Sequence, residues 1–171
     1  MAYAVVSVIG HDRPGFVREL AALALRCELN IEDTRATGLG SEFAVLMGVT
    51  GAATGIDALE RALGEDSGLA FVLQRSEPGA AGRGVERVSV TVLAMDHPGI
   101  VHSVTGFFAE RNLNIEELIT ETRPAPHTGS PLFDLRMQVS VASDQNVNEL
   151  GAAFGSFCQD EDLDGSLNAA G

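Results

Sequence analysis

The sequence contains an internal duplication, and this feature most constrains how the chain folds. The phrase Gly10-His11-Asp12-Arg13-Pro14-Gly15 returns as Ala94-Met95-Asp96-His97-Pro98-Gly99, and the two aspartates are 84 positions apart. At the same spacing, Leu29-Asn30-Ile31-Glu32 returns as Leu113-Asn114-Ile115-Glu116. A repeat of about 80 residues is long enough for a small domain and too long for a solenoid repeat. The duplication therefore predicts two domains.

We place the first domain at residues 1–76 and the second at 85–171. The intervening stretch 77–84 contains Pro78 and three glycines, a composition typical of a linker. The third-strand pattern Phe43, Val45, Met47, Val49 is repeated 90 positions later, not 84. The difference predicts a six-residue insertion in the second copy, within the proline-rich stretch 123–131, and a longer hairpin loop there.

Each copy shows the same order of predicted elements. Residues 3–9 and 88–92 have the short apolar or alternating pattern of strands. Helices are expected to begin at Pro14 and Pro98, because proline lacks the N–H that the first helical turn leaves unpaired. They are expected to end near Asn30 and Asn114 in a left-handed residue. Their expected inward faces are Val17, Leu20, Ala21, Ala24 and Cys27 in the first copy, and Val101, Val104, Thr105 and Phe108 in the second.

Second strands are expected to start at Ile31 and Ile115, followed by the alternating third strands. Second helices follow, capped by Thr54 and by Ser143. A fourth strand is clear at 69–73 and weak at 163–168. The order β-α-β-β-α-β is that of the ferredoxin-like fold, an α+β architecture with a four-stranded antiparallel sheet and two helices on one face.

Composition and motifs exclude several classes of function. Eleven Lys and Arg against 24 Asp and Glu give a net charge of -13, which disfavours direct binding of nucleic acid. No apolar run approaches a membrane span, and the start of the chain resembles a strand more than a signal peptide. We expect a soluble cytoplasmic protein in which Cys27 and Cys158 are small core residues. The four histidines have no shared zinc spacing, and we expect no metal, cofactor or catalytic residue.

The repeated Asp-x-Pro-Gly loop and the Asn-Ile turn have two interpretations. In the architectural one, the aspartate caps the helix, the proline starts it, the glycine allows close packing and the asparagine ends it. In the functional one, free N–H groups at Gly15, Phe16, Gly99 and Ile100 bind a carboxylate, and Asp12 or Asp96 meets an ammonium. The second interpretation predicts a site for a small zwitterion, with loop and turn at neighbouring ends of the first helix and second strand.

These motifs, in a duplicated β-α-β-β-α-β order, resemble a pair of ACT domains, the amino-acid-sensing regulatory module. In length and tandem arrangement the chain is most similar to the glycine cleavage system transcriptional repressor family. The resemblance implies effector binding at the loop, often at a domain interface. The implied ligand-binding residues are Asp12, Arg13, Pro14, Gly15, Asn30 and Ile31 in the first copy, and Asp96, His97, Pro98, Gly99, Asn114 and Ile115 in the second.

The resemblance further implies a non-catalytic sensor of a small amino acid, with glycine and serine as first choices. The sensor would act through protein contact on a transcription regulator of glycine or one-carbon metabolism. One alternative is a regulatory subunit of a separate amino-acid-metabolising enzyme. Another is an acylphosphatase-like hydrolase using Arg13 and Asn30 or Asn112, which the second copy disfavours because His97 replaces the arginine. Exposed sheet edges also favour a homodimer.

Overall fold

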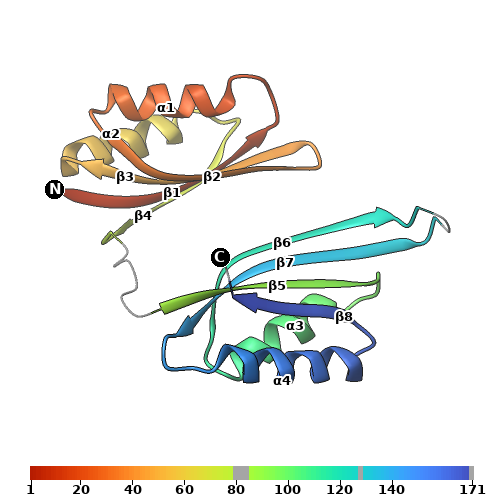
Figure 1. Ribbon diagram of the computed structural model, residues 1–171. Coiled ribbons are helices and arrows are strands. Elements are labelled where there is room, and N and C mark those ends of the chain that lie inside the picture. Colours follow the sequence, from red (N-terminus) through yellow and green to blue (C-terminus); the bar gives the residue numbers. More distant parts are fainter. Residues whose placement is uncertain (79–84, 127–128, 170–171) are drawn as a thin grey trace. The chain divides into compact units, whose positions relative to one another are not determined.

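The computed structural model describes residues 1–78, 85–126 and 129–169, and it divides into two compact units, Met1–Ala80 and Ala81–Gly171 (Figure 1). Most of the predicted linker, residues 79–84, falls outside the described ranges, and so do residues 127 and 128 of the predicted hairpin insertion. Each domain is considered by itself below.

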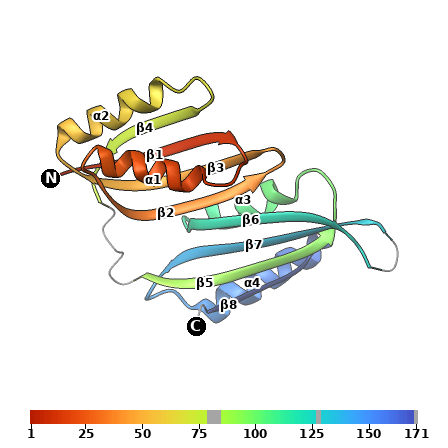
Figure 2. The ribbon, with the colours of Figure 1, turned by 90° about the horizontal axis from the view of Figure 1, so that it is seen from above.

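The first domain contains β1 (Ala2–His11), α1 (Phe16–Arg26), β2 (Asn30–Leu39), β3 (Glu42–Gly51), α2 (Ala53–Gly64) and β4 (Ala70–Ser76). Its sheet has the order β2-β3-β1-β4, and the pairs β1–β3, β1–β4 and β2–β3 are all antiparallel (Figure 2). Both helices cover the same face of the sheet, which leaves the other face uncovered by this domain's own elements (Figure 1).

The second domain repeats this arrangement with β5 (Val85–Met95), α3 (Ile100–Ala109), β6 (Asn114–Pro124), β7 (Pro131–Ala142), α4 (Val147–Asp160) and β8 (Asp164–Ala169). The strand order β6-β7-β5-β8 is the equivalent of the first. The weak fourth-strand pattern near the end of the sequence is a real strand, since β8 pairs with β5 over six residues. The predicted ferredoxin-like fold is confirmed in both domains.

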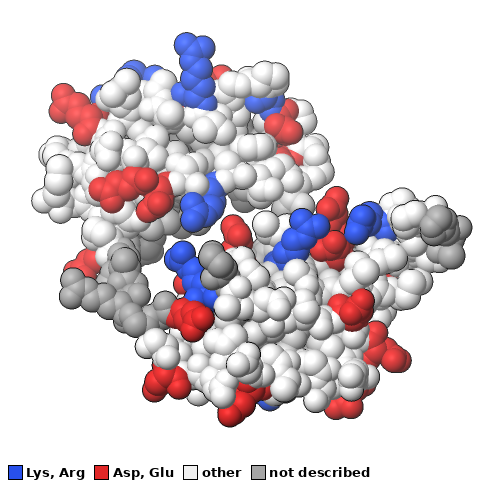
Figure 3. Space-filling model, viewed as in Figure 1, with Lys and Arg blue, Asp and Glu red and all other residues white. Residues whose placement is uncertain are grey.

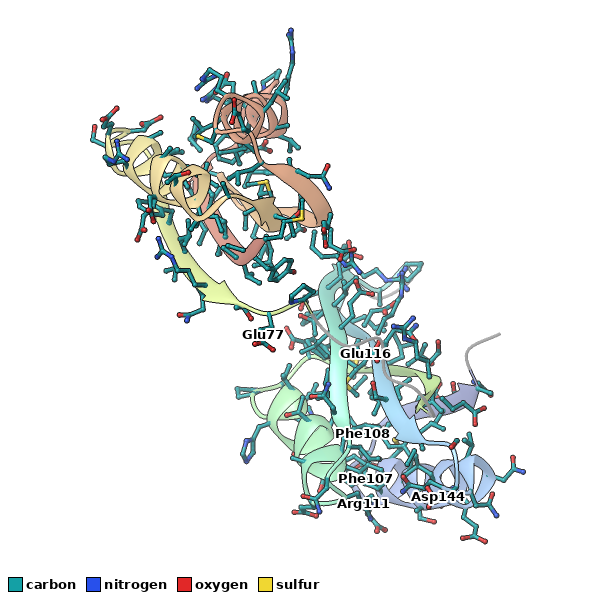
Figure 4. The ribbon with its side chains drawn as sticks, turned by 90° about the vertical axis from the view of Figure 1, so that its left-hand side faces the viewer. Glu77, Phe107, Phe108, Arg111, Glu116 and Asp144 are labelled. Atoms are coloured by element: carbon teal, nitrogen blue, oxygen red, sulfur yellow. The ribbon has the colours of Figure 1, made fainter. Side chains whose placement is uncertain are left out.

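Each domain has its own hydrophobic core between sheet and helices. Alternate residues of the central strands point into it, such as Val6 and Val8 on β1 and Val90 and Val92 on β5, all less than 3% exposed. The second core is the more aromatic one. Its helices supply Phe107, Phe108, Phe154 and Phe157, whose rings lie 5.0 to 6.0 Å apart, and the Arg111 guanidinium lies 3.7 Å above the Phe107 ring (Figure 4).

The first helix of each domain begins two residues later than predicted, at Phe16 and Ile100. A turn at the glycine of the phrase separates the proline from the helix. Leu20 and Ala24 are buried as predicted, but the first position of the inward face differs. Phe16 and Ile100 are buried, whereas Val17 and Val101, predicted to face inward, are 40% and 38% exposed.

The predicted helix caps were also wrong. The cap of α2 is Ala52, not Thr54, and it has no side-chain hydrogen bond. The cap of α4 is Asn146, not Ser143, and its side-chain oxygen accepts from the N–H groups of Asn148 and Glu149. The left-handed residues after α1 and α3 are Glu28 and Asn112, because Asn30 and Asn114 are already the first residues of β2 and β6. Both cysteines are free thiols; Cys158 is buried and Cys27 is half-buried.

Candidate functional site

The repeated loop between first strand and first helix has the same geometry in both domains. Gly15 has φ 89° and Gly99 has φ 105°, which is a left-handed conformation that disfavours any residue with a Cβ. Each glycine precedes the helix and its carbonyl accepts the first helical hydrogen bond, from Glu19 and from Ser103. The glycine thus turns the chain out of the strand and into the helix. This requirement explains why it recurs after the proline.

The two aspartates of the loop do not cap these helices, since neither cap has a side-chain hydrogen bond. Their backbone N–H groups instead bond to the following hairpin, Asp12 to the Ser41 carbonyl and Asp96 to the Pro131 carbonyl, both at 3.0 Å. The Asp96 carboxylate accepts a hydrogen bond of 3.4 Å from the Thr122 hydroxyl on β6. The purely architectural interpretation of these carboxylates is therefore incomplete, because their role as caps is wrong.

The loops differ most at the position after the aspartate. In the first domain the Arg13 guanidinium donates to both Glu19 carboxylate oxygens, at 2.5 and 2.6 Å, and lies 5.7 Å from the centre of the Phe16 ring. This hydrogen bonding lowers the pKa of Glu19 and raises that of Arg13. In the second domain His97 and Ser103 occupy the matching positions, so the ion pair cannot form there.

The N–H groups expected to face a ligand are not all available. The Phe16 N–H donates to the Arg13 carbonyl at 3.3 Å. Arg13 and Phe16 also help to line a hollow of about 390 Å³ between α1 and α2, with Leu23, Ala62 and Asp66 on its other sides. In the first domain, the side chain of Arg13 is therefore next to a space between the helices.

The structure does not bring Asn30 and Ile31 near the loop of the same domain. Asn30 is paired with Thr50, whereas His11, next to the loop, is paired with Glu42 at the other end of β3. Eight residues of strand separate Glu42 from Thr50, or about 26 Å. Asn114 is likewise paired with Ser140, eight residues from Leu132, which is paired with Met95 beside the second loop. The expectation of neighbouring ends was wrong, because the loop precedes the helix and the turn follows it.

The glutamate of the repeated Leu-Asn-Ile-Glu phrase has a structural role that the sequence interpretation missed. The pairing of β2 with β3 shifts between Ile31 and Asp33, so Glu32 is the extra residue of a β-bulge. Its carboxylate accepts a hydrogen bond of 3.0 Å from the Thr50 hydroxyl. In the second domain Glu116 is at the same bulge and accepts from the Ser140 hydroxyl, and Arg87 pairs with it at 2.6 Å (Figure 4). The identical position of this glutamate in both copies of the phrase was the sequence signal that could have indicated its role.

These contacts predict the titration of Glu116. The hydrogen bond from Ser140, and secondarily the charge of Arg87, lower the pKa of this carboxyl below the ordinary glutamate value of 4.5. A lowered folded-state pKa stabilises the fold above the unfolded-state value, and this contribution is lost as pH falls through the folded-state pKa. Carbon-detected NMR titration is expected to give a midpoint below 4.5 that rises in Ser140→Ala. An unchanged midpoint in that variant would contradict the assignment to the hydroxyl.

Within residues 1–78, 85–126 and 129–169, no group of three or more His, Cys, Asp or Glu side chains is placed to hold a metal ion. Of the helices in the same ranges, none combines the length and the apolar character needed to cross a membrane.

Comparison with known proteins adds the family. Two models described as ACT domain match residues 2–71 and 88–152. A curated relative, the glycine cleavage system transcriptional repressor of Escherichia coli strain K12, is 28% identical over 169 residues, covering 97% of this chain and 89% of the relative.

Two solved structures match nearly the whole chain. A protein of unknown function from Galdieria sulphuraria has a TM-score of 0.82 at 29% identity, covering 99% of both chains. A structure assigned to a glycine cleavage system transcriptional repressor has a TM-score of 0.74 at 28% identity, covering 99% of this chain and 97% of the other. The regulatory character of the two transcriptional repressors agrees with the expectation of a protein that is not an enzyme. The chain belongs to the ACT-domain family and contains two such domains in tandem.

Proposed function

We propose that the chain senses a small amino acid, with glycine and serine as first choices, and acts on a transcription regulator through protein contact. The observation that carries the proposal is the loop from Asp12 to Gly15, whose sequence and left-handed glycine both recur in the second domain. The similarity to glycine cleavage system repressors supports glycine or one-carbon metabolism as the controlled process. The net charge of -13 supports an indirect mechanism in which the partner contacts DNA.

Pairing of two chains would explain how loop and Asn-Ile turn serve one site although they are far apart in each domain. β2 and β6 are edge strands of 10 and 11 residues, with backbone groups on one side available for pairing. If two copies of β2 pair antiparallel, the start of one lies beside the end of the other. Asn30 of one chain would then approach the Asp12 loop of its partner. We therefore include a homodimer in the proposal.

Asp12→Ala and Asp96→Ala are expected to weaken amino-acid binding about tenfold or more, because a charge-assisted hydrogen bond to the ammonium is lost. Neither aspartate caps a helix, so the free energy of unfolding should change by less than about 0.5 kcal/mol. Isothermal titration calorimetry with the twenty amino acids measures the first effect and denaturant unfolding the second.

The matched control is Asp144→Ala, which removes an exposed aspartate between β7 and α4, at the opposite end of the second sheet from Asp96 (Figure 4). It should bind like the unmodified chain. Absence of heat with every amino acid would refute sensing. Affinity capture with and without the bound amino acid then distinguishes a transcription regulator from a metabolic enzyme as partner, and sedimentation of the same samples tests the homodimer.

A further inference from the structure

The two sheets differ in the chemistry of the face that the helices leave open. The registers allow the faces to be compared position by position. In six places a nonpolar side chain of the first domain corresponds to a polar or charged one in the second: Val5 to Ser89, Leu39 to Arg123, Ala44 to Asp134, Leu46 to Arg136, Ala70 to Asp164 and Val72 to Ser166. The opposite exchange occurs from Arg35 to Ile119 and from Glu42 to Leu132. Because the fold is the same in both domains, the fold does not require these charges.

The charged positions surround a hollow of about 360 Å³ on the open face of the second sheet. Its lining includes the side chains of β5, β6, β7 and β8, with Leu93 at the centre of the row that joins Asp164 to Asp134. Basic and acidic side chains lie close together over β6 and β7 (Figure 3). The matching region of the first sheet has Ile9, Leu46 and Val72, each more than 40% exposed.

One side of the hollow carries two arginine side chains. Arg136 holds Asp134 with two contacts of 3.2 Å, and the Arg123 guanidinium approaches the same carboxylate at 3.5 Å. The Asp134 side chain is only 16% exposed, whereas the two arginines are 65% and 55% exposed. Two guanidiniums thus contact the Asp134 carboxylate, and Glu121 lies opposite Asp134 on the same face. A guanidinium has five N–H donors, so donors remain for another anion.

The other side of the hollow is negatively charged. Asp164 on β8 is exposed and forms no ion pair with any residue in the described ranges. Between the two sides the hydroxyls of Thr91 and Ser166 are 2.9 Å apart. Asp164 and Asp134 are two strand spacings apart, or about 10 Å, a gap that the long arginine side chains reduce. A ligand in the hollow would therefore meet a free carboxylate on one side and guanidinium donors on the other.

We propose that this hollow binds a small α-amino acid, with its carboxylate on Arg136 and Arg123, its ammonium on Asp164 and its side chain against Leu93. The choice of ligand rests on the proposed amino-acid sensing, but the site is separate from the Asp96 loop. Thr91 and Ser166 offer further hydrogen bonds to the ligand's polar groups. The first domain lacks this site, because Leu39, Leu46 and Ala70 stand where Arg123, Arg136 and Asp164 do in the second.

The test measures binding of glycine and serine by calorimetry, with the full chain and with variants of it. In each variant, one residue of the second domain is replaced by the residue at the matching position of the first domain. Arg136→Leu copies Leu46, and Asp164→Ala copies Ala70. Each is expected to weaken binding about tenfold or more, since one charged partner is lost. Arg35→Leu, the same change on the open face of the first sheet, is the matched control and should have no effect. Unfolding temperatures confirm that all three variants fold.

Amide NMR spectra locate the binding. We expect glycine or serine to change the amide chemical shifts of Thr91, Asp134 and Ser166. These changes should disappear in Arg136→Leu and persist in Asp96→Ala. Chemical-shift changes that are confined to residues 96–99 and unaltered in Arg136→Leu would rule out binding at the hollow. They would leave the proposed function intact. Binding at the hollow without capture of a regulator or enzyme would support the inference and count against the proposed function. No shift with any amino acid would contradict both.

Discussion

Phe154→Ala is expected to lower the free energy of unfolding of the second domain by about 3–5 kcal/mol, the usual cost of deleting a large buried aromatic side chain. Phe154 is fully buried on α4 and its ring lies 5.2 to 6.0 Å from those of Phe107, Phe108 and Phe157. The ring faces the sheet, where a Cβ added at Gly165 would be 3.1 Å from it. Little room exists for neighbours to close the cavity without moving the helix.

Hydrogen exchange measures this effect in each domain separately. Amides of β5 and β7 should lose protection, whereas those of β1 and β3 should keep it, because the two buried clusters share no residue. Phe154→Leu is the control, since it keeps much of the volume and should cost less. Equal loss of protection in both domains would show that the cores do not unfold independently.

Gly15→Ala and Gly99→Ala are each expected to cost about 1–2 kcal/mol, because a Cβ disfavours the left-handed conformation. The φ values of 89° and 105° lie beyond the usual left-handed value near 57°. We therefore expect the loss of stability to be towards the upper end of this range. Space is not the cause, since a Cβ at Gly99 would meet nothing within 4 Å.

Gly106→Ala provides the opposite control within the neighbouring helix. Gly106 also has nothing within 4 Å of an added Cβ, but it lies inside α3 with helical conformation. There alanine is favoured over glycine by about 1 kcal/mol, so stability should rise. Denaturant midpoints of the three variants test the pair of predictions. Stabilisation by Gly99→Ala would show that the loop relaxes to another conformation.

The order of elements and the buried residues of the strands could be predicted from the sequence. They follow from the duplication and from the alternation of nonpolar and polar residues along each strand. Val45, Met47 and Val49 were placed correctly in this way, and all are buried. Local pattern carries enough information for such positions.

Helix starts were not predictable from proline alone. Proline is favoured in the first helical turn, but here the following glycine adopts a left-handed conformation, and the helix starts only after it. Phe16, and not Val17, is the first residue of the inward face. Asp12 and Asn30 were expected to lie close together, but α1 runs between them. The loop at the start of this helix and the turn after its end therefore lie at opposite ends of the sheet.

The hollow on the second sheet was missed for a related reason. Arg123, Asp134 and Asp164 come from three strands, and no two of them are close in the sequence. Only the registers place them in adjacent rows of one face. The positional comparison between copies becomes informative once β8 is aligned with β4, and the sequence signal for β8 was weak.

The one-sided covering of each sheet has an evolutionary consequence. Residues that determine folding, such as Val6 and Val90, face the helices, whereas the open face contributes little to the core. After duplication, substitutions on the open face would have been nearly neutral for folding, so natural selection could alter one copy while the other kept its original surface. Leu46 and Arg136 occupy matching positions on β3 and β7. Paralogous domains of this kind can therefore diverge on the open face without loss of folding.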